Sequence, residues 1–191
     1  MSEKSNIKYK KLKEKHLSFK DSDTGFKKKV ILKTFEQPNG FVETFFIDDD
    51  KDSVQIFAIN TENMVCVVKQ FRPGTEKVEL ELPGGGKEIG EDPLSAALRE
   101  LEEETAWIPG QIHHLASKPY SPYSKGIRHM YMAVNCTKKE DESLNLDPNE
   151  HLTVHKISID DCLKLALKAE IRGWDSILLG LHKLGYLDRT Y

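Results

Sequence analysis

A glycine-rich turn runs directly into a helical pattern in residues 85–104, which read GGKEIGEDPLSAALRELEEE. From Asp92 onward the signals are helical, because Pro93 suits the first turn of a helix. One apolar stripe at helical spacing follows, formed by Leu94, Ala97, Leu98 and Leu101. The stripe predicts a helix that packs on a core and has the glycine-rich turn at its N-terminal end.

The later part of this helix carries carboxylates on one face. Glu100, Glu103 and Glu104 are spaced i, i+3 and i+4, so their side chains point the same way on a helix. Like charges so placed repel each other by roughly 0.2–0.5 kcal/mol per pair. Hard anionic oxygens are also the ligands that Mg²⁺ or Mn²⁺ requires, and a glycine-rich loop lets backbone atoms approach a metal or phosphate. The pattern thus indicates either a solvated acidic face or a metal site.

Strand patterns dominate the rest of the chain and predict an α/β (α+β) fold. A hairpin is expected from Val30–Phe35 and Phe41–Ile47 around the turn signal at residues 37–40. Further strands are expected at Val54–Ile59, Met64–Phe71, Lys77–Leu82, Gln111–Ser117, Ile127–Cys136 and His151–Ile157. Residues 137–150 are expected to form a loop. Helices are expected at Ser158–Ala169, capped by Ser158, and at Asp175–Leu184. The sum is a mixed sheet with helices packed on it.

Charge divides the chain into two parts. Residues 1–29 hold ten lysines and four acidic residues, whereas residues 30–191 hold 18 basic and 27 acidic residues. An acidic body argues against nucleic-acid binding, which needs a broad basic surface. The Lys-rich start could contact phosphate or a membrane surface, but a solvated, partly frayed end is the favoured interpretation. We therefore divide the chain into residues 1–50, a basic segment with a β-hairpin, and residues 51–191, the domain around the acidic helix.

Composition also predicts the compartment. The longest apolar runs, such as Met64–Val68, have five residues, far fewer than the roughly 20 that span a membrane. The first residues lack the pattern of a secretory signal. Cys66, Cys136 and Cys162 are an odd, widely spaced set, which argues against a disulfide framework or a zinc ribbon. These features predict a cytoplasmic protein with no membrane partner.

The spacing G-x5-E-x7-R-E-U-x-E-E, where U is aliphatic, is that of the Nudix box, and the chain resembles a Nudix hydrolase. The match covers Gly85, Glu91, Arg99, Glu100, Leu101, Glu103 and Glu104. It departs at Ala106 and Trp107, where the family usually has a glycine and an aliphatic residue. Because alanine adopts the left-handed conformation less readily than glycine, the helix is expected to run slightly longer.

Flanking residues narrow the resemblance to the branch of ADP-ribose pyrophosphatases and nucleoside-diphosphate-sugar hydrolases. That branch typically has a strand ending in Q-x-R and then E-L-P-A/G-G, found here at residues 70–72 and 81–85. Pro122 lies fifteen positions beyond Trp107, where the branch tends to carry a proline, and residues 147–154 look like its acidic loop. The resemblance implies a Nudix α/β/α sandwich with a mixed sheet, plus a small N-terminal antiparallel strand region that commonly forms a homodimer.

The resemblance also implies roles for individual residues. Mg²⁺, with Mn²⁺ as an alternative, would bind the carboxylates of Glu100, Glu103 and Glu104 and the backbone carbonyl of Gly84. Arg99 would orient these glutamates, Glu91 would support the geometry of loop and helix, and Gly85 and Gly86 would contact the substrate.

Three assignments keep an alternative open. Arg72 would hold a substrate phosphate or, alternatively, pair with Glu79 or Glu81. The general base would be Glu150, with Asp147 as substitute, unless both are solvated loop acids. An aromatic residue from a partner's hairpin would stack on the base of the nucleotide, with Phe41, Phe45 and Phe46 as candidates.

The implied reaction is metal-dependent hydrolysis of the pyrophosphate linkage of ADP-ribose or a related nucleoside diphosphate sugar, giving a nucleoside monophosphate and a sugar phosphate. One alternative is a Nudix hydrolase that acts on a dinucleoside polyphosphate, a coenzyme or a modified nucleoside triphosphate. Another is a non-catalytic ligand sensor with the same fold. The intact carboxylate cluster argues against the sensor, because pure binding does not require repelling charges.

Overall fold

The computed structural model describes residues 7–140, 144–146 and 151–187. The chain divides into two compact units. One contains the residues up to Lys51 together with Pro119–Ile127, and the other contains Asp52–Lys118 and the residues from Arg128 onward. Residues 119–127 were expected in the second part of the chain. The two candidates for the general base, Asp147 and Glu150, lie outside the described residues.

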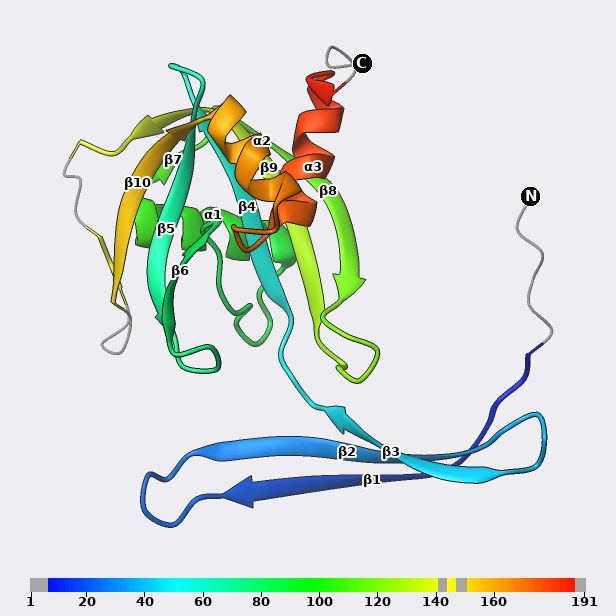
Figure 1. The fold of residues 1–191 in the computed structure, drawn as a ribbon. Helices are drawn as coiled ribbons and strands as arrows, with labels where there is room; N and C mark the ends of the chain where they lie inside the picture. The colour runs from blue at the N-terminus through cyan, green and yellow to red at the C-terminus, as the bar shows by residue number, and fades with distance from the viewer. Residues whose placement is uncertain (1–6, 141–143, 147–150, 188–191) are drawn as a thin grey trace. The chain divides into compact units, whose positions relative to one another are not determined.

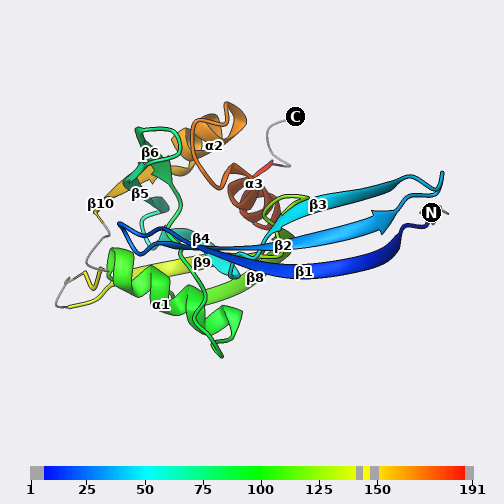
Figure 2. The ribbon, with the colours of Figure 1, turned by 90° about the horizontal axis from the view of Figure 1, so that it is seen from below.

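The first unit is built on a three-stranded antiparallel sheet (Figure 2). Its strands are β1 (Lys10–Lys20), β2 (Lys27–Glu36) and β3 (Val42–Asp48). Strands β2 and β3 form the expected hairpin. The expectation of a frayed Lys-rich end is wrong for residues 10–20, because β1 pairs with β2 over its whole length. Its lysines stay exposed, so the strand remains strongly basic.

The second unit is built on a seven-stranded mixed sheet. Its strands are β4 (Ser53–Asn60), β5 (Met64–Arg72), β6 (Lys77–Glu81), β7 (Trp107–Ile108), β8 (Gln111–Pro119), β9 (Ile127–Lys138) and β10 (Leu152–Ser158). The order along the sheet is β10-β5-β4-β9-β7, with β6 beside β5 and β8 beside β9. Strands β4 and β9 run parallel, whereas β5 is antiparallel to β4, β6 and β10.

Helices cover both faces of this sheet (Figure 1). Helix α1 (Pro93–Thr105) lies on one face, and α2 (Ile159–Leu167) and α3 (Trp174–Lys183) lie on the other. Successive side chains of β4 point to opposite faces of the sheet. Ile56 packs in the hydrophobic core on the α1 side, and Phe57 packs in the core on the side of α2 and α3. This arrangement confirms the α/β/α sandwich with a mixed sheet.

Helix α1 ends at Thr105, so the expectation of a longer helix is wrong. Ala106 adopts the left-handed conformation with φ 56°, and its N–H donates to the carbonyl of Glu102 at 2.8 Å. The chain then turns directly into β7, where Trp107 is 2% exposed and pairs with Lys138 of β9. Burial and strand pairing thus outweigh the roughly 1–2 kcal/mol that this conformation costs an L-residue.

Two expectations based on composition concern cysteines and membrane spans. Cys66, Cys136 and Cys162 are buried free thiols, and burial raises the pKa of each to about 12. Over the described ranges, no helix is both long enough and apolar enough to cross a membrane.

Close packing between α3 and β4 predicts a sensitive position at Gly180. A Cβ built there would lie 2.9 Å from Cε1 of Phe57, which is fully buried. Overpacking of this kind costs about 1–3 kcal/mol, more than the roughly 1 kcal/mol that alanine gains over glycine in a helix. Gly180→Ala is therefore expected to lower the free energy of unfolding, measured with urea. Gly74→Ala is the control, because a Cβ there meets nothing within 4 Å. A Gly180→Ala protein as stable as the parent would contradict this packing.

Candidate active site

The glycine-rich turn is held against β4 by backbone hydrogen bonds. Val54 N–H donates to the carbonyl of Gly85, and Ile56 N–H donates to the carbonyl of Pro83, both at 2.9 Å. Gly84 has a φ of 149°, and a Cβ there would lie 2.9 Å from Cα of Gln55. Only glycine allows this close approach, because any side chain would collide with the β4 backbone.

Glu100 and Glu104 are buried against this turn, at 8% and 2% exposed. A carboxylate oxygen of Glu104 accepts a hydrogen bond from Gly84 N–H at 2.8 Å. A Cβ on Gly85 would lie 2.6 Å from the carboxyl carbon of Glu100, so the missing side chain makes room for the carboxylate. The two glutamates stand one helical turn apart, and α1 therefore delivers both to the same turn.

Arg99 ties the turn to the helix through several hydrogen bonds. Its guanidinium donates to Glu91 at 3.0 and 3.1 Å, to Glu100 at 2.8 Å and to Glu103 at 2.9 Å. It also donates to the carbonyl of Gly86 at 3.1 Å. These carboxylates, Glu91 first, hold the pKa of Arg99 above its ordinary value. Arg99, followed by the backbone N–H of Glu88, lowers the pKa of Glu91.

The donor set fits a hard divalent cation. Glu100 and Glu104 bring carboxylate oxygens to the turn whose Gly84 carbonyl is the fourth expected ligand, and oxygen is the atom that Mg²⁺ and Mn²⁺ prefer. In the described part of the chain, no three side chains of the metal-binding types gather closely enough to mark a cation site by themselves. Arg99 bridges Glu100 and Glu103 in this structure, so here the guanidinium supplies the positive charge between them.

Arg72 makes the ion pair that was the alternative to phosphate binding. Its guanidinium donates to both carboxylate oxygens of Glu81, at 2.6 and 2.5 Å, and Glu81 is only 5% exposed. Arg172, between α2 and α3, pairs with Glu79 and lies 3.5 Å from Glu81. Sequence reasoning missed Arg172, because nothing in its local pattern indicates a partner 93 positions away.

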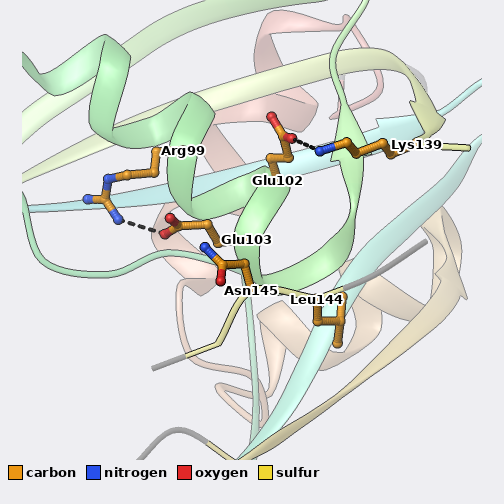
Figure 3. Close-up of a pocket in the computed structure, with 6 residues that line it drawn as sticks. All are labelled: Arg99, Glu102, Glu103, Lys139, Leu144 and Asn145. Carbon is orange, nitrogen blue, oxygen red and sulfur yellow. Dashed lines mark hydrogen bonds and ion pairs between the residues drawn. The ribbon is translucent and has the colours of Figure 1, made fainter. Parts of the chain in front are cut away.

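A cavity of about 490 Å³ lies beside α1 (Figure 3). It is lined by Arg99, Glu102, Glu103, Lys139, Leu144 and Asn145. The N–H of Asn145 donates to the carbonyl of Glu103 at 3.0 Å, and Nζ of Lys139 lies 2.7 Å from Glu102. Sequence reasoning missed Lys139 and Asn145, because they belong to a polar segment without a periodic pattern.

A second cavity, of about 380 Å³, lies within the first unit and contains one of the three candidate phenylalanines. The ring of Phe45 stacks on Tyr123 with centroids 6.2 Å apart and meets Phe35 edge-on at 6.1 Å. Phe41 and Phe46 are exposed instead.

A sandwich in which one helix presents buried carboxylates to a glycine-rich turn has the architecture of a Nudix hydrolase. The family model for the NUDIX domain matches residues 49–176. The chain therefore belongs to the Nudix family, and it is a hydrolase of the pyrophosphatase type.

Relatives and a solved structure agree with this assignment. An ADP-ribose pyrophosphatase of Bacillus subtilis (strain 168) is 31% identical over 163 residues, which are 85% of this chain and 88% of that protein. A methanol dehydrogenase activator of Bacillus methanolicus is 36% identical over 137 residues, or 71% and 74% of the two chains. The crystal structure of an ADP compounds hydrolase matches 94% of this chain and 97% of its own, with a TM-score of 0.74 and 20% identity. At 20% identity, the similarity to this solved structure shows that the two proteins share a fold.

The Arg99–Glu91 pair predicts a stability difference that depends on pH. The pKa of Glu91 is lowered below 4.5 in the folded protein, so its stabilising contribution is present above about pH 4.5 and is lost as pH falls through the folded pKa. Glu91→Gln removes this contribution. The variant is therefore expected to be less stable than the parent at pH 7, and the difference is expected to shrink as pH falls below 4.5. Urea unfolding from pH 7 to pH 3.5 measures it, and a difference independent of pH would contradict the pairing.

Proposed function

We propose that the chain hydrolyses the pyrophosphate linkage of ADP-ribose or a related nucleoside diphosphate sugar, releasing a nucleoside monophosphate and a sugar phosphate. The observation that carries the proposal is the burial of Glu100 and Glu104 against Gly84 and Gly85. Burying carboxylates is costly unless hydrogen bonds or cations compensate, which disfavours a merely solvated acidic face. Similarity to the B. subtilis ADP-ribose pyrophosphatase supports the substrate class.

The proposed cofactor is Mg²⁺, with Mn²⁺ as an alternative, held by Glu100, Glu103, Glu104 and the carbonyl of Gly84. When bound, a divalent cation neutralises phosphate oxygens and lowers the pKa of a water molecule. The buried carboxylates at the glycine-rich turn support this assignment, because their oxygens suit such a cation.

The proposed roles of the other residues follow from their contacts. Arg99 holds Glu100 and Glu103 in place, and Glu91 fixes Arg99 through two hydrogen bonds. Arg72 is proposed to hold a substrate phosphate, and its pair with Glu81 fixes the guanidinium at the end of β5.

Substrate contacts at the glycine-rich turn and a general base complete the proposed site. Gly85 and Gly86 are proposed to contact the substrate, and the open space beside Gly86, where a Cβ would meet nothing within 4 Å, supports this role for Gly86. A general base takes the proton of the attacking water, whose oxygen joins one phosphate as the bridging P–O bond breaks. Glu150, with Asp147 as substitute, remains the prediction for this base, as Phe41, Phe45 and Phe46 remain the candidates for stacking on the nucleotide base.

The main competitor is a Nudix hydrolase of another specificity, acting on a dinucleoside polyphosphate, a coenzyme or a modified nucleoside triphosphate. A non-catalytic sensor is disfavoured, because the intact carboxylates serve no purpose in pure binding. The decisive experiment is a product-release assay with Mg²⁺ over nucleoside diphosphate sugars, dinucleoside polyphosphates and nucleoside triphosphates, reading both products of each. Preferential release of AMP and ribose phosphate from ADP-ribose supports the proposal, and preference for another class overturns it.

Glu104→Gln is expected to lower turnover at least about a hundredfold while the fold survives. A lost metal ligand removes stabilisation that develops mainly in the transition state, and a hundredfold corresponds to roughly 3 kcal/mol. Turnover of ADP-ribose at saturating Mg²⁺ measures the effect, with the unfolding midpoint as a check on folding. Glu62→Gln, in the exposed turn between β4 and β5, is the matched control. Near-parental turnover of folded Glu104→Gln protein would exclude the metal-site assignment.

The first unit supports a proposed homodimer. Several of its large apolar side chains are exposed, namely Leu12, Phe19, Phe26, Phe41, Val42 and Phe46. A small sheet with exposed apolar residues is stabilised when a second subunit covers them. We assign dimerisation to residues 1–50 and catalysis to residues 51–191. The three buried free thiols suit the reducing cytoplasm that we propose as the compartment.

Sedimentation is expected to give a mass near twice the 21.8 kDa of one chain. Phe46→Lys is expected to shift the equilibrium toward the monomer, because burying an unpaired charge in an apolar interface is unfavourable. Lys156→Met, on β10 of the second unit, serves as the control. A mass of one chain at every protein concentration would contradict the dimer.

A further inference from the structure

The charged side chains that line the cavity beside α1 are already paired with one another (Figure 3). Nη1 of Arg99 lies 2.9 Å from Glu103, and Nζ of Lys139 lies 2.7 Å from Glu102. Two cations and two anions therefore face the cavity, and without a metal ion on Glu103 the formal charge of its described lining is zero. A phosphate site needs an excess of positive charge and of N–H donors. The cavity therefore suits an uncharged part of a ligand.

The same walls provide hydrogen-bond donors and acceptors side by side. Carboxylates accept, the ammonium group donates, and the side-chain amide of Asn145 does both. Leu144 adds one apolar surface. Each hydroxyl of a sugar is both donor and acceptor, and the ring carries C–H groups that contact apolar surface. The lining therefore has the chemistry that recognises a polyhydroxylated ring.

The segments that contain Lys139 and Asn145 are hydrogen-bonded to the C-terminal end of α1. The N–H of Asn145 donates to the carbonyl of Glu103 at 3.0 Å, and the N–H of Lys139 donates to the carbonyl of Ala106 at 2.8 Å. Carbonyls at a helix C-terminus lack partners within the helix, so these bonds satisfy groups that need them. They also fix Lys139 and Asn145 beside Arg99 and Glu103, two residues of the candidate active site.

From this lining we propose that the cavity binds the terminal sugar of the nucleotide sugar, with Asn145 and Lys139 as residues that determine specificity. The inference rests on the proposed function and deepens it, because it places the sugar half of the substrate next to Arg99 and Glu103. The volume of about 490 Å³ lies within the range of small-molecule sites. Asn145 supplies an amide to the hydroxyls, and Lys139 keeps the lining neutral by balancing Glu102.

The first test removes either the amide or the sugar. The substrates are ADP-ribose and the β-methyl ester of ADP, which keeps the diphosphate diester and lacks the terminal sugar. The measured quantity is the ratio of kcat/KM for the two substrates. Asn145→Ala is expected to lower this ratio about fivefold, as the loss of one hydrogen bond predicts, whereas the control Lys156→Met leaves the ratio unchanged. Equal losses on both substrates would overturn the sugar assignment, because a purely structural effect does not depend on the sugar.

The second test changes the charge of the cavity. Glu102→Gln makes the lining positive by one charge, and Lys139→Met makes it negative by one. Relative to ADP-ribose, hydrolysis of diadenosine triphosphate is expected to rise about threefold in the first variant and to fall about threefold in the second, as for a modest interaction between exposed charges. Shifts in the same direction, or no shift in either variant, would overturn the assignment.

Failure of the proposed function is distinguishable from failure of this inference. A parent protein that releases no ribose phosphate from ADP-ribose in the presence of Mg²⁺ contradicts the proposed function itself. Calorimetric titration with ribose 5-phosphate then tests whether the cavity binds a sugar, independently of catalysis. Affinity that falls about fivefold in Asn145→Ala supports a sugar subsite, and equal affinity in variant and parent overturns it.

Discussion

Repulsion among the carboxylates near the C-terminal end of α1 is the constraint on which the second unit depends. Glu102, Glu103 and Glu104 lie in the last turn, which has no basic residue of its own and is fully described. They stand at the negative end of the helix dipole, where anions are unfavourable. The compensation comes from elsewhere: Arg99 one turn earlier, Lys139 beyond β9 and the N–H of Gly84 ahead of the helix. The sheet must hold all these partners in place.

This arrangement explains why packing around the site is so tight. The glycine-rich turn has to lie within hydrogen-bond reach of Glu104, and its close contact with β4 fixes that position. β9 runs to Lys138, so the next residue reaches Glu102, while its pairing with β7 sets where α1 ends. Sequences tend to break local rules at functional sites and compensate elsewhere. A run of acidic residues at the C-terminal end of a helix breaks such a rule. Its partners come from an earlier turn of α1, from the residue after β9 and from the glycine-rich turn.

Much of the fold could be predicted from sequence, because the spacing of apolar residues and the residues that cap helices or form turns are local signals. The helix after Asp92, the Ser158 cap and the strands of the central sheet other than β7 follow from such patterns, and the structure has them. The two-residue strand β7 was not predicted. β1 was missed because lysines at both strand faces hide its alternation. The end of α1 was misjudged because the conformation of Ala106 is set by tertiary pairing. Likewise, Arg172 and Asn145 act through partners far away in sequence, which no local pattern encodes.

The two environments on α1 differ in charge, and this difference bears on the kind of substrate. Glu100 and Glu104 are buried toward the glycine-rich turn, where negative charge favours a cation that can in turn neutralise a diphosphate. Glu102 and Glu103 face the cavity beside α1, where Lys139 pairs with Glu102, and Arg99 pairs with Glu103 as well as with the carboxylates nearer the turn. A substrate with a charged diphosphate and an uncharged end fits these two neighbouring environments, the carboxylates at the glycine-rich turn and the cavity beside α1. A chain of additional phosphates would place negative charge where the protein supplies no excess of positive charge in its described lining, at a cost in desolvation that paired side chains do not offset. In the described lining, this charge pattern supports the proposal of a nucleoside diphosphate sugar rather than a dinucleoside polyphosphate.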